Sequence, residues 1–448
     1  MRTEEVSKIA ARGSSDTSEV ASPRATTPYR RRRRSRQADR QEVSRIVSTP
    51  LEPGSAATER IRDPDARRSG RALAALATLA AATLAAVTLA RADDGRNFAG
   101  SVQLDYLAVP TERVARDQAL DGATVELSLK LTQDFGHDVT SSVKVCVACH
   151  GLEVGMAYFD IRLADEASVR VGRFTPAFGS FPLRHDPANH RTSDKPLPYD
   201  MGRMLHLRDW NEGILPAPWV DNGLELSGTH FFAHGQLDYA AYAVSGPKGP
   251  ADGLDFDYTL SRSGERYYVD NNSRPTVGAR LGGVRELGDT TTLTAGASTM
   301  LGHYDPDARL GFVIAGADLV LRRGRTFLRA EYLARWTELA LGDDPASRFK
   351  YGPGADGTYA DFTRKDGFYV EAEVPAGPLE LIGRWDGLRR RGNVAATSLL
   401  RSDSALLRYT LGAALPVRGL RLKTSVEAYD FSDFDDELAL HLGIAGPF

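Results

Sequence analysis

Cysteine, methionine and long apolar runs are scarce in this 448-residue chain, which contains two cysteines and five methionines. Two cysteines cannot support a disulfide-rich scaffold. A helical membrane protein with several spans is also excluded, because each span needs about 20 consecutive apolar residues. A membrane β-barrel stays possible, since its strands alternate apolar with polar residues and give an ordinary overall composition. The 42 glycines fit such a chain of strands and turns.

The net charge of −3 hides an uneven distribution of charge along the chain. Residues 1–92 hold 18 of the 56 basic and 10 of the 59 acidic residues, which leaves 38 basic and 49 acidic residues for 93–448. Residues 1–71 are rich in Arg, Ser, Thr, Ala and Pro and include the run Arg30–Arg34, so we predict a disordered extension. Such a run can bind nucleic acid, but we favour the plain extension and expect no nucleic-acid partner.

A weakly apolar stretch separates this extension from the rest of the chain. Residues 72–90 are mostly Ala and Leu, arginines precede them, and Ala90-Arg91-Ala92 follows. The positively charged flank, the apolar run and the A-x-A site together predict a signal peptide over 72–92, and a transmembrane anchor is the alternative. An extension of 71 residues before a signal peptide is unusually long. A later translation start would explain it but would need a non-ATG codon, because no methionine lies between Met1 and Met156.

Residues 93–448 consist of segments in which apolar and polar residues alternate. Such a period places the two sets on opposite faces of a strand. Short and long connections also alternate, and the long ones include 177–220, 246–275 and 336–365, as in outer-membrane barrels with short turns on one rim. The predicted strands are 98–109, 122–133, 139–148, 153–163, 167–176, 221–231, 235–245, 276–287, 290–301, 309–322, 325–335, 366–375, 378–390, 402–414, 418–430 and 437–448.

The end of the chain favours the same fold. Leu438, Leu440, Leu442 and Ile444 share one face, and the last residue is Phe448, which resembles the final strand of outer-membrane barrels despite Pro447. We therefore predict an all-β, antiparallel transmembrane barrel of about sixteen strands over 93–448, exported to the outer membrane of a Gram-negative cell. A soluble β-sandwich or propeller is the alternative, and it would not explain the signal peptide and the unequal rims together.

One strand end carries a short motif. Gly172-Arg173-Phe174-Thr175-Pro176-Ala177-Phe178-Gly179 resembles a strand end of phosphate-selective porin O/P-like proteins. The resemblance to bacterial porins covers roughly residues 95–448. It implies that the third outer loop, about 177–220, folds into the lumen and narrows it, and that a trimer is possible. The candidate constriction residues are basic: Arg173, Arg184, Arg191, Arg203 and Arg208.

Both cysteines fall in one motif, Cys146-Val147-Ala148-Cys149-His150. C-x-x-C-H is typical of c-type haem attachment, in which two thiols bind the vinyl groups and the histidine becomes the proximal iron ligand. The motif predicts one covalent haem c on Cys146 and Cys149, with His150 on the iron. A disulfide does not need His150, and zinc would want a second ligand pair, so these are weaker readings.

The alternation of strand 139–148 predicts that Cys146 faces the lumen, near the loop 177–220. We therefore expect haem between the 146–150 turn and that loop. Histidine and methionine side chains of the loop could supply the sixth iron ligand, and the candidates are His185, His190, Met201, Met204 and His206.

Two functions follow from these predictions. The first is a haem-bearing barrel that transfers electrons; because one haem cannot bridge a hydrocarbon layer of about 30 Å, it would need partner cytochromes in the periplasm or at the surface. The second is a porin for small, phosphate-like anions without a redox role. We expect no enzyme, since the sequence has no G-x-S-x-G elbow and no paired acid motif.

Overall fold

The computed structural model describes residues 96–111, 121–148, 151–200, 213–258, 269–401 and 403–448. The predicted extension 1–71 and signal peptide 72–92 lie outside these residues. Within the described ranges, no helix is long and apolar enough to cross a membrane. The helical turns that lie wholly within these ranges are short: η1 (Phe181–Arg184), η2 (Leu197–Tyr199) and α3 (Pro345–Arg348).

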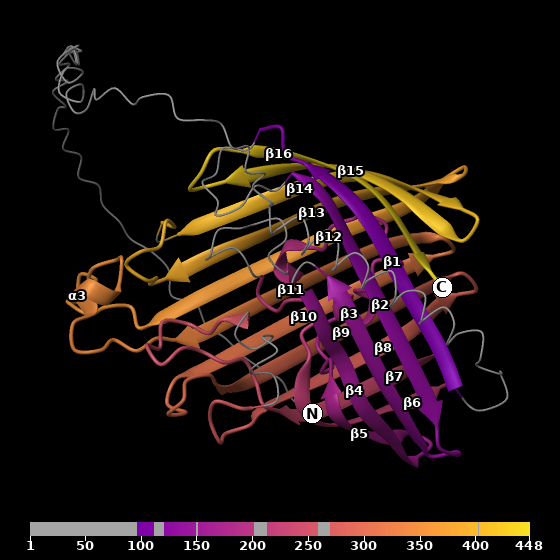
Figure 1. The fold of residues 1–448 in the computed structure, drawn as a ribbon, viewed down its shortest axis with the longest axis horizontal. Coiled ribbons are helices and arrows are strands. Elements are labelled where there is room, and N and C mark those ends of the chain that lie inside the picture. The colour runs from indigo at the N-terminus through magenta and orange to yellow at the C-terminus, as the bar shows by residue number, and fades with distance from the viewer. Residues whose placement is uncertain (1–95, 112–120, 149–150, 201–212, 259–268, 402) are drawn as a thin grey trace, which may run out of the picture. The chain divides into compact units, whose positions relative to one another are not determined.

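Sixteen antiparallel strands of the described chain form a closed barrel, in which each strand pairs with its neighbours in sequence and β1 pairs with β16 (Figure 1). This confirms the predicted all-β barrel. The strands are β1 (Arg96–Ala108), β2 (Gly122–Asp134), β3 (Val139–Ala148), β4 (Gly151–Ala164), β5 (Ala167–Phe174), β6 (Asp221–Phe232), β7 (Gly235–Val244), β8 (Thr276–Gly288), β9 (Thr291–His303), β10 (Gly311–Arg323), β11 (Thr326–Glu338), β12 (Phe362–Ala376), β13 (Leu379–Gly392), β14 (Ser404–Val417), β15 (Leu420–Phe431) and β16 (Glu437–Pro447).

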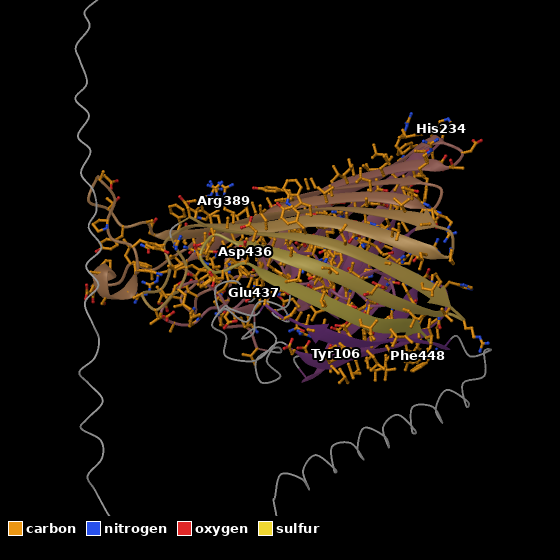
Figure 2. All side chains as sticks on the ribbon, turned by 90° about the horizontal axis from the view of Figure 1, so that it is seen from above. Tyr106, His234, Arg389, Asp436, Glu437 and Phe448 are labelled. Carbon is orange, nitrogen blue, oxygen red and sulfur yellow. The ribbon has the colours of Figure 1, made fainter. Side chains whose placement is uncertain are left out.

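The two rims of the barrel differ as the sequence predicts. Turns of two to four residues join β2 to β3, β4 to β5 and the later even strands to the next odd ones, whereas the long connections lie at the opposite rim. Figure 2 shows His234, which lies in a short turn, at one end of the barrel, and Arg389, Asp436 and Glu437 towards the other.

The predicted strand boundaries are within three residues of the observed ones, with one exception. β12 begins at Phe362, four residues before the predicted start at 366, and β11 continues to Glu338, so the predicted loop 336–365 is 339–361. The Trp336 ring stacks on Phe362 with centroids 4.2 Å apart, which extends the pairing of these two strands beyond the alternating pattern.

The barrel wall is polar inside and apolar outside. On β14, the outward side chains of Tyr409 and Leu411 are 49% and 74% exposed, whereas the inward Arg408 and Thr410 are 0% and 1% exposed. The same inversion recurs on other strands, where leucines, valines and aromatics are exposed and charged side chains are buried. A soluble barrel has the opposite arrangement, because burial of apolar surface stabilises a fold in water.

Candidate functional site

The connection between β5 and β6, residues 175–220, enters the barrel, and we call its described parts the lumen loop. Its first turn is bonded to the far wall: Gly179 N donates to Ser298 Oγ of β9 at 3.0 Å, and Phe181 N donates to Glu331 Oε1 of β11 at 2.7 Å. Gly179 has φ +64°, and a Cβ there would collide with Tyr199 and Glu331. Glycine is therefore required where the loop approaches this glutamate.

Glu331 is the central acceptor for the lumen loop. Its two oxygens accept hydrogen bonds from the backbone N–H groups of Ser180 and Phe181 and from the hydroxyls of Tyr199 and Tyr369, at 2.5 to 3.0 Å. Three of these four donors belong to the loop. A carboxylate that accepts four bonds in a buried site fixes the position of every donor around it.

The next part of the loop lies against β13, β14 and β15. Arg408 donates to Asp386 at 2.5 and 3.0 Å, to the Asp194 carboxylate and to the Lys195 carbonyl at 2.6 Å. Asp386 also accepts the Leu197 N–H at 2.9 Å. Because Arg408 and Asp386 are fully buried, this cluster attaches the loop to the wall through desolvated, charge-assisted hydrogen bonds.

The lumen loop also reaches towards the rim of short turns. Arg191 forms an ion pair with Glu380 at 2.7 Å, and Arg421 Nη1 donates to the Ala188 carbonyl at 2.6 Å. Glu380 and Arg421 are each the second residue of their strand, β13 and β15, next to the short turns. The loop therefore extends from the rim of long loops down most of the barrel.

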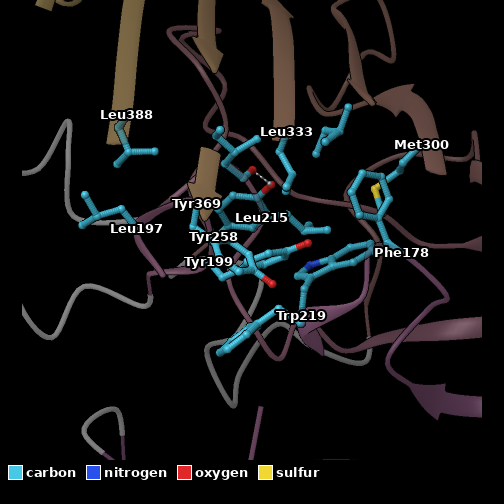
Figure 3. Packing of buried hydrophobic residues seen from close by; sticks show 14 of the residues in the cluster. Phe178, Leu197, Tyr199, Leu215, Trp219, Tyr258, Met300, Leu333, Tyr369 and Leu388 are labelled. Carbon is cyan, nitrogen blue, oxygen red and sulfur yellow. Dashed lines mark hydrogen bonds between the residues drawn. The ribbon is translucent and has the colours of Figure 1, made fainter. Parts of the chain in front are cut away.

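Apolar side chains of the loop pack together inside the barrel near the long-loop rim (Figure 3). Tyr199 stacks on Phe181, with ring centroids 5.3 Å apart, and the Tyr258 hydroxyl donates to the Ile214 carbonyl at 2.8 Å. Trp219, which is 3% exposed, belongs to the same cluster. The barrel thus encloses an apolar core around the loop as well as the charged network.

The two described loop arginines of the predicted basic constriction each contact a carboxylate that they share with other arginines. Arg184 lies 3.3 Å from Glu371 and Arg191 lies 2.7 Å from Glu380. Arg173 donates to the Val154 carbonyl at 3.1 Å and belongs to the wall rather than the loop. The other two predicted residues, Arg203 and Arg208, lie outside the described residues.

Cys146 of the haem motif lines a cavity of about 80 Å³ on the lumen side of β3, together with Ser128, Gly155 and the loop residues His185 and Asp186. Ligand pockets usually measure about 300–1,000 Å³. This cavity fits a few water molecules, so a haem on Cys146 would have to lie outside it or displace the lumen loop. Cys149 and His150 lie outside the described residues.

The structure brings His185 to Cys146 but not His190. His185 Nε2 lies 3.2 Å from Lys144 Nζ, and burial together with the Lys144 charge lowers the pKa of His185 to about 4. His190 donates through Nδ1 to the Thr192 carbonyl at 2.9 Å, and burial and Lys423 hold its pKa well below the ordinary value. Both imidazoles are neutral at pH 7, the form that binds metals. Met201, Met204 and His206 lie outside the described residues.

The buried acceptors that hold the lumen loop are the residues that sequence reasoning missed, chiefly Glu331 and Asp386. The alternation could have indicated them as candidates, because an acidic residue on the lumen face of a strand needs a hydrogen-bond donor or a cation as its partner. The pattern could not indicate which of the many inward acids bind the loop.

No family model and no curated protein match the sequence. Among solved structures, the barrel is similar to OmpF of Salmonella typhi in complex with daunomycin (12% identity, 80% of this chain and 99% of that one, TM-score 0.49). It is similar to an anion-selective porin from Comamonas acidovorans (12% identity, 79% and 99%, TM-score 0.46) and to OmpT, an outer membrane protein of Vibrio cholerae (10% identity, 80% and 99%, TM-score 0.44).

Proposed function

We propose that this chain is an outer-membrane barrel of the porin type, in which the lumen loop restricts the passage of small polar solutes. The observation that carries the proposal is the inverted wall, with exposed apolar side chains outside and buried charged ones inside. A hydrocarbon environment stabilises such an exterior, and a closed barrel satisfies every backbone hydrogen bond within the bilayer.

The contacts of the lumen loop determine what kind of passage is expected. The loop is bonded to strands across the barrel and extends towards the short-turn rim, so it reduces the cross-section over much of the lumen's height. Arg184 and Arg191 have carboxylate partners, but Glu371 is shared with Arg329 and Arg384, and Glu380 is shared with Arg421. Positive charge therefore remains along the loop, and we expect a small conductance with a modest preference for anions.

Planar bilayer recordings on the purified full chain test this proposal. We expect discrete small steps in salt solution and larger steps after residues 187–195 are replaced by a short Gly-Ser linker. The matched control replaces residues 351–358, in the long connection between β11 and β12, by the same linker and leaves the step size unchanged. Equal steps in all three proteins would contradict a restricting role for the lumen loop.

A second function that we propose is a covalent c-type haem, which the C-x-x-C-H motif predicts. The cavity of about 80 Å³ at Cys146 would have to open for the group to enter it. Cys146, the first cysteine of the C-x-x-C-H motif, is on the lumen side of β3 and shares its cavity with a neutral histidine of the lumen loop. A bound haem would supply one-electron chemistry, with Cys146 and Cys149 as the linking thiols and His150 as the proximal ligand. Electron transfer across the membrane would then need partner cytochromes.

The haem is tested on protein that is exported together with a cytochrome c maturation system. We expect the intact mass to rise by one haem and a c-type pyridine haemochrome spectrum, both lost in Cys146→Ala/Cys149→Ala. His185→Ala then tests the distal ligand through a change in the visible spectrum. An unmodified mass would remove the redox function and leave the porin. Native mass measurements in detergent would show whether the barrel is a trimer, as the porin resemblance suggests.

A further inference from the structure

A second cluster of ligand-type side chains lies at the junction of β1, β15 and β16. The strand register brings three of them together: His441 of β16 is opposite Ser425, so it is diagonal to Glu427 on β15, and Asp105 of β1 is opposite Gly443, two residues after His441. All three side chains are buried and therefore face the lumen. Diagonal neighbours on one face of a sheet are within reach of each other. Asp194 of the lumen loop completes the group.

One ligand atom each from Asp194, Glu427 and His441 lie within 4.8 Å of one another, and all three residues are buried. Bonds of about 2.0–2.2 Å at tetrahedral angles place ligand atoms about 3.5 Å apart. The three groups would therefore have to close by only about 1 Å to hold one ion. Asp194 is on a loop rather than on a strand, and it would do so by leaving Arg408 Nη1.

The histidine is oriented towards the cluster. His441 Nδ1 lies 3.0 Å from Asp105 Oδ2, which fixes the ring. Its Nε2 has no hydrogen-bond partner among the described residues, although His441 is only 2% exposed, and Glu427 Oε2 lies 3.8 Å away. A carboxylate–histidine pair of this kind, with the second nitrogen aimed at an open position, is how metal-binding histidines are held.

The charges around the cluster favour a cation. Asp105, Asp194, Asp386 and Glu427 contact the cluster or its arginines, and Arg384 and Arg408 each contact more than one of these carboxylates. Arg408 Nη1 donates to both Asp194 and Glu427, so these two carboxylates already converge on one positive charge, whose place an ion beside His441 would take. Buried carboxylates that converge in this way are stabilised by a cation between them.

We propose that Asp194, Glu427 and His441 bind one divalent transition-metal ion of the zinc class, which fastens the lumen loop to the seam where the barrel closes. The imidazole ligand favours zinc and its neighbours over magnesium and calcium, which prefer oxygen alone. Asp105 is a positioning residue that orients His441. The site is independent of the haem motif.

Cobalt(II) is the probe, because its visible absorption reports the ligand set. The full chain is produced without cytochrome c maturation, carries Cys146→Ser/Cys149→Ser so that thiols do not compete, and is stripped with a chelator before titration in detergent. We expect one Co²⁺ per chain and displacement by Zn²⁺. His441→Ala should weaken binding by about 100-fold or more, and Asp105→Asn by about 10–100-fold.

His230→Ala is the matched control, since His230 lies 3.0 Å from Glu166 in an exposed histidine–carboxylate pair. It should leave the titration unchanged. If His441→Ala does not fold, as judged by its heat-modifiable mobility, X-ray absorption of the zinc-loaded parent should show one imidazole and at least two oxygen ligands. Failure of the parent to bind an ion in stoichiometric amount, or equal losses in His230→Ala and His441→Ala, would overturn the proposal and leave a water-bridged cluster.

Discussion

Substitution of Glu331 should perturb the attachment of the lumen loop most directly. The substitution Glu331→Gln keeps the size of the side chain but replaces one acceptor oxygen by an NH₂ donor. Each carboxylate oxygen accepts hydrogen bonds from one backbone N–H and one tyrosine hydroxyl. In either orientation of the glutamine side chain, its NH₂ group therefore faces two hydrogen-bond donors and cannot accept from them. The loop residues Ser180, Phe181 and Tyr199 supply three of the four donors.

The size of the effect follows from these bonds. A hydrogen bond to a charged group contributes about 1.5–3 kcal/mol, so losing two costs about 3–6 kcal/mol. Rotation of a tyrosine hydroxyl recovers part of this by making the hydroxyl an acceptor. Since about 1.4 kcal/mol corresponds to a factor of ten, the equilibrium between the docked and released loop should shift by about 100-fold or more towards release.

Single-channel recording measures that shift. The unaltered protein should give small, steady steps, and Glu331→Gln should give larger or frequently switching ones. Glu166→Gln, in an exposed short turn, is the matched control and should behave like the parent. A folded Glu331→Gln barrel with unchanged steps would refute the reasoning, because the loop would then be held by something other than these bonds.

Three further predictions concern the exterior, the seam and pH. Leu411→Arg should destabilise the barrel in lipid by up to about 2–4 kcal/mol in urea titrations, because this residue is 74% exposed on the outer wall. Gly100→Val should lower the melting temperature in detergent, because a Cβ there would meet the Phe448 ring at 2.4 Å. The pKa of His185 is lowered from its ordinary 6.5 to about 4 in the folded chain, so between these pH values the unfolded chain binds a proton on this histidine and the folded chain does not. The free energy of unfolding, measured by urea titration, should therefore fall as pH drops from 6.5 to 4, and His185→Gln should reduce that slope.

The fold could be predicted from the sequence because period-2 alternation specifies a strand and its faces locally. The predicted lumen face of β3 is confirmed, for example, by Lys144, which is buried against the lumen loop, and by the outward Val143, which is 44% exposed. The alternation failed only where pairing continues beyond it, as at Phe362.

The site could be predicted only in part. The resemblance to porins correctly implied that the third outer loop enters the lumen, and the alternation of β3 correctly placed the Cys146 side chain on the lumen side. Which wall residue meets which loop residue depends on contacts such as Arg408 with Asp194, which are 214 positions apart in the chain. No local pattern encodes such pairs, so the alternation could place glutamates in the lumen but could not predict that Arg184 meets Glu371 or that Arg191 meets Glu380.

The most direct test of the central claim compares two tryptophans on opposite sides of the wall. Trp385 is 46% exposed on the outer face of β13, and Trp219 is 3% exposed inside the barrel. In single-tryptophan variants reconstituted into vesicles, lipids with brominated acyl chains should strongly quench the fluorescence of Trp385 and leave that of Trp219 nearly unchanged. Equal quenching of both, or of neither, would contradict a membrane-spanning barrel with a filled lumen.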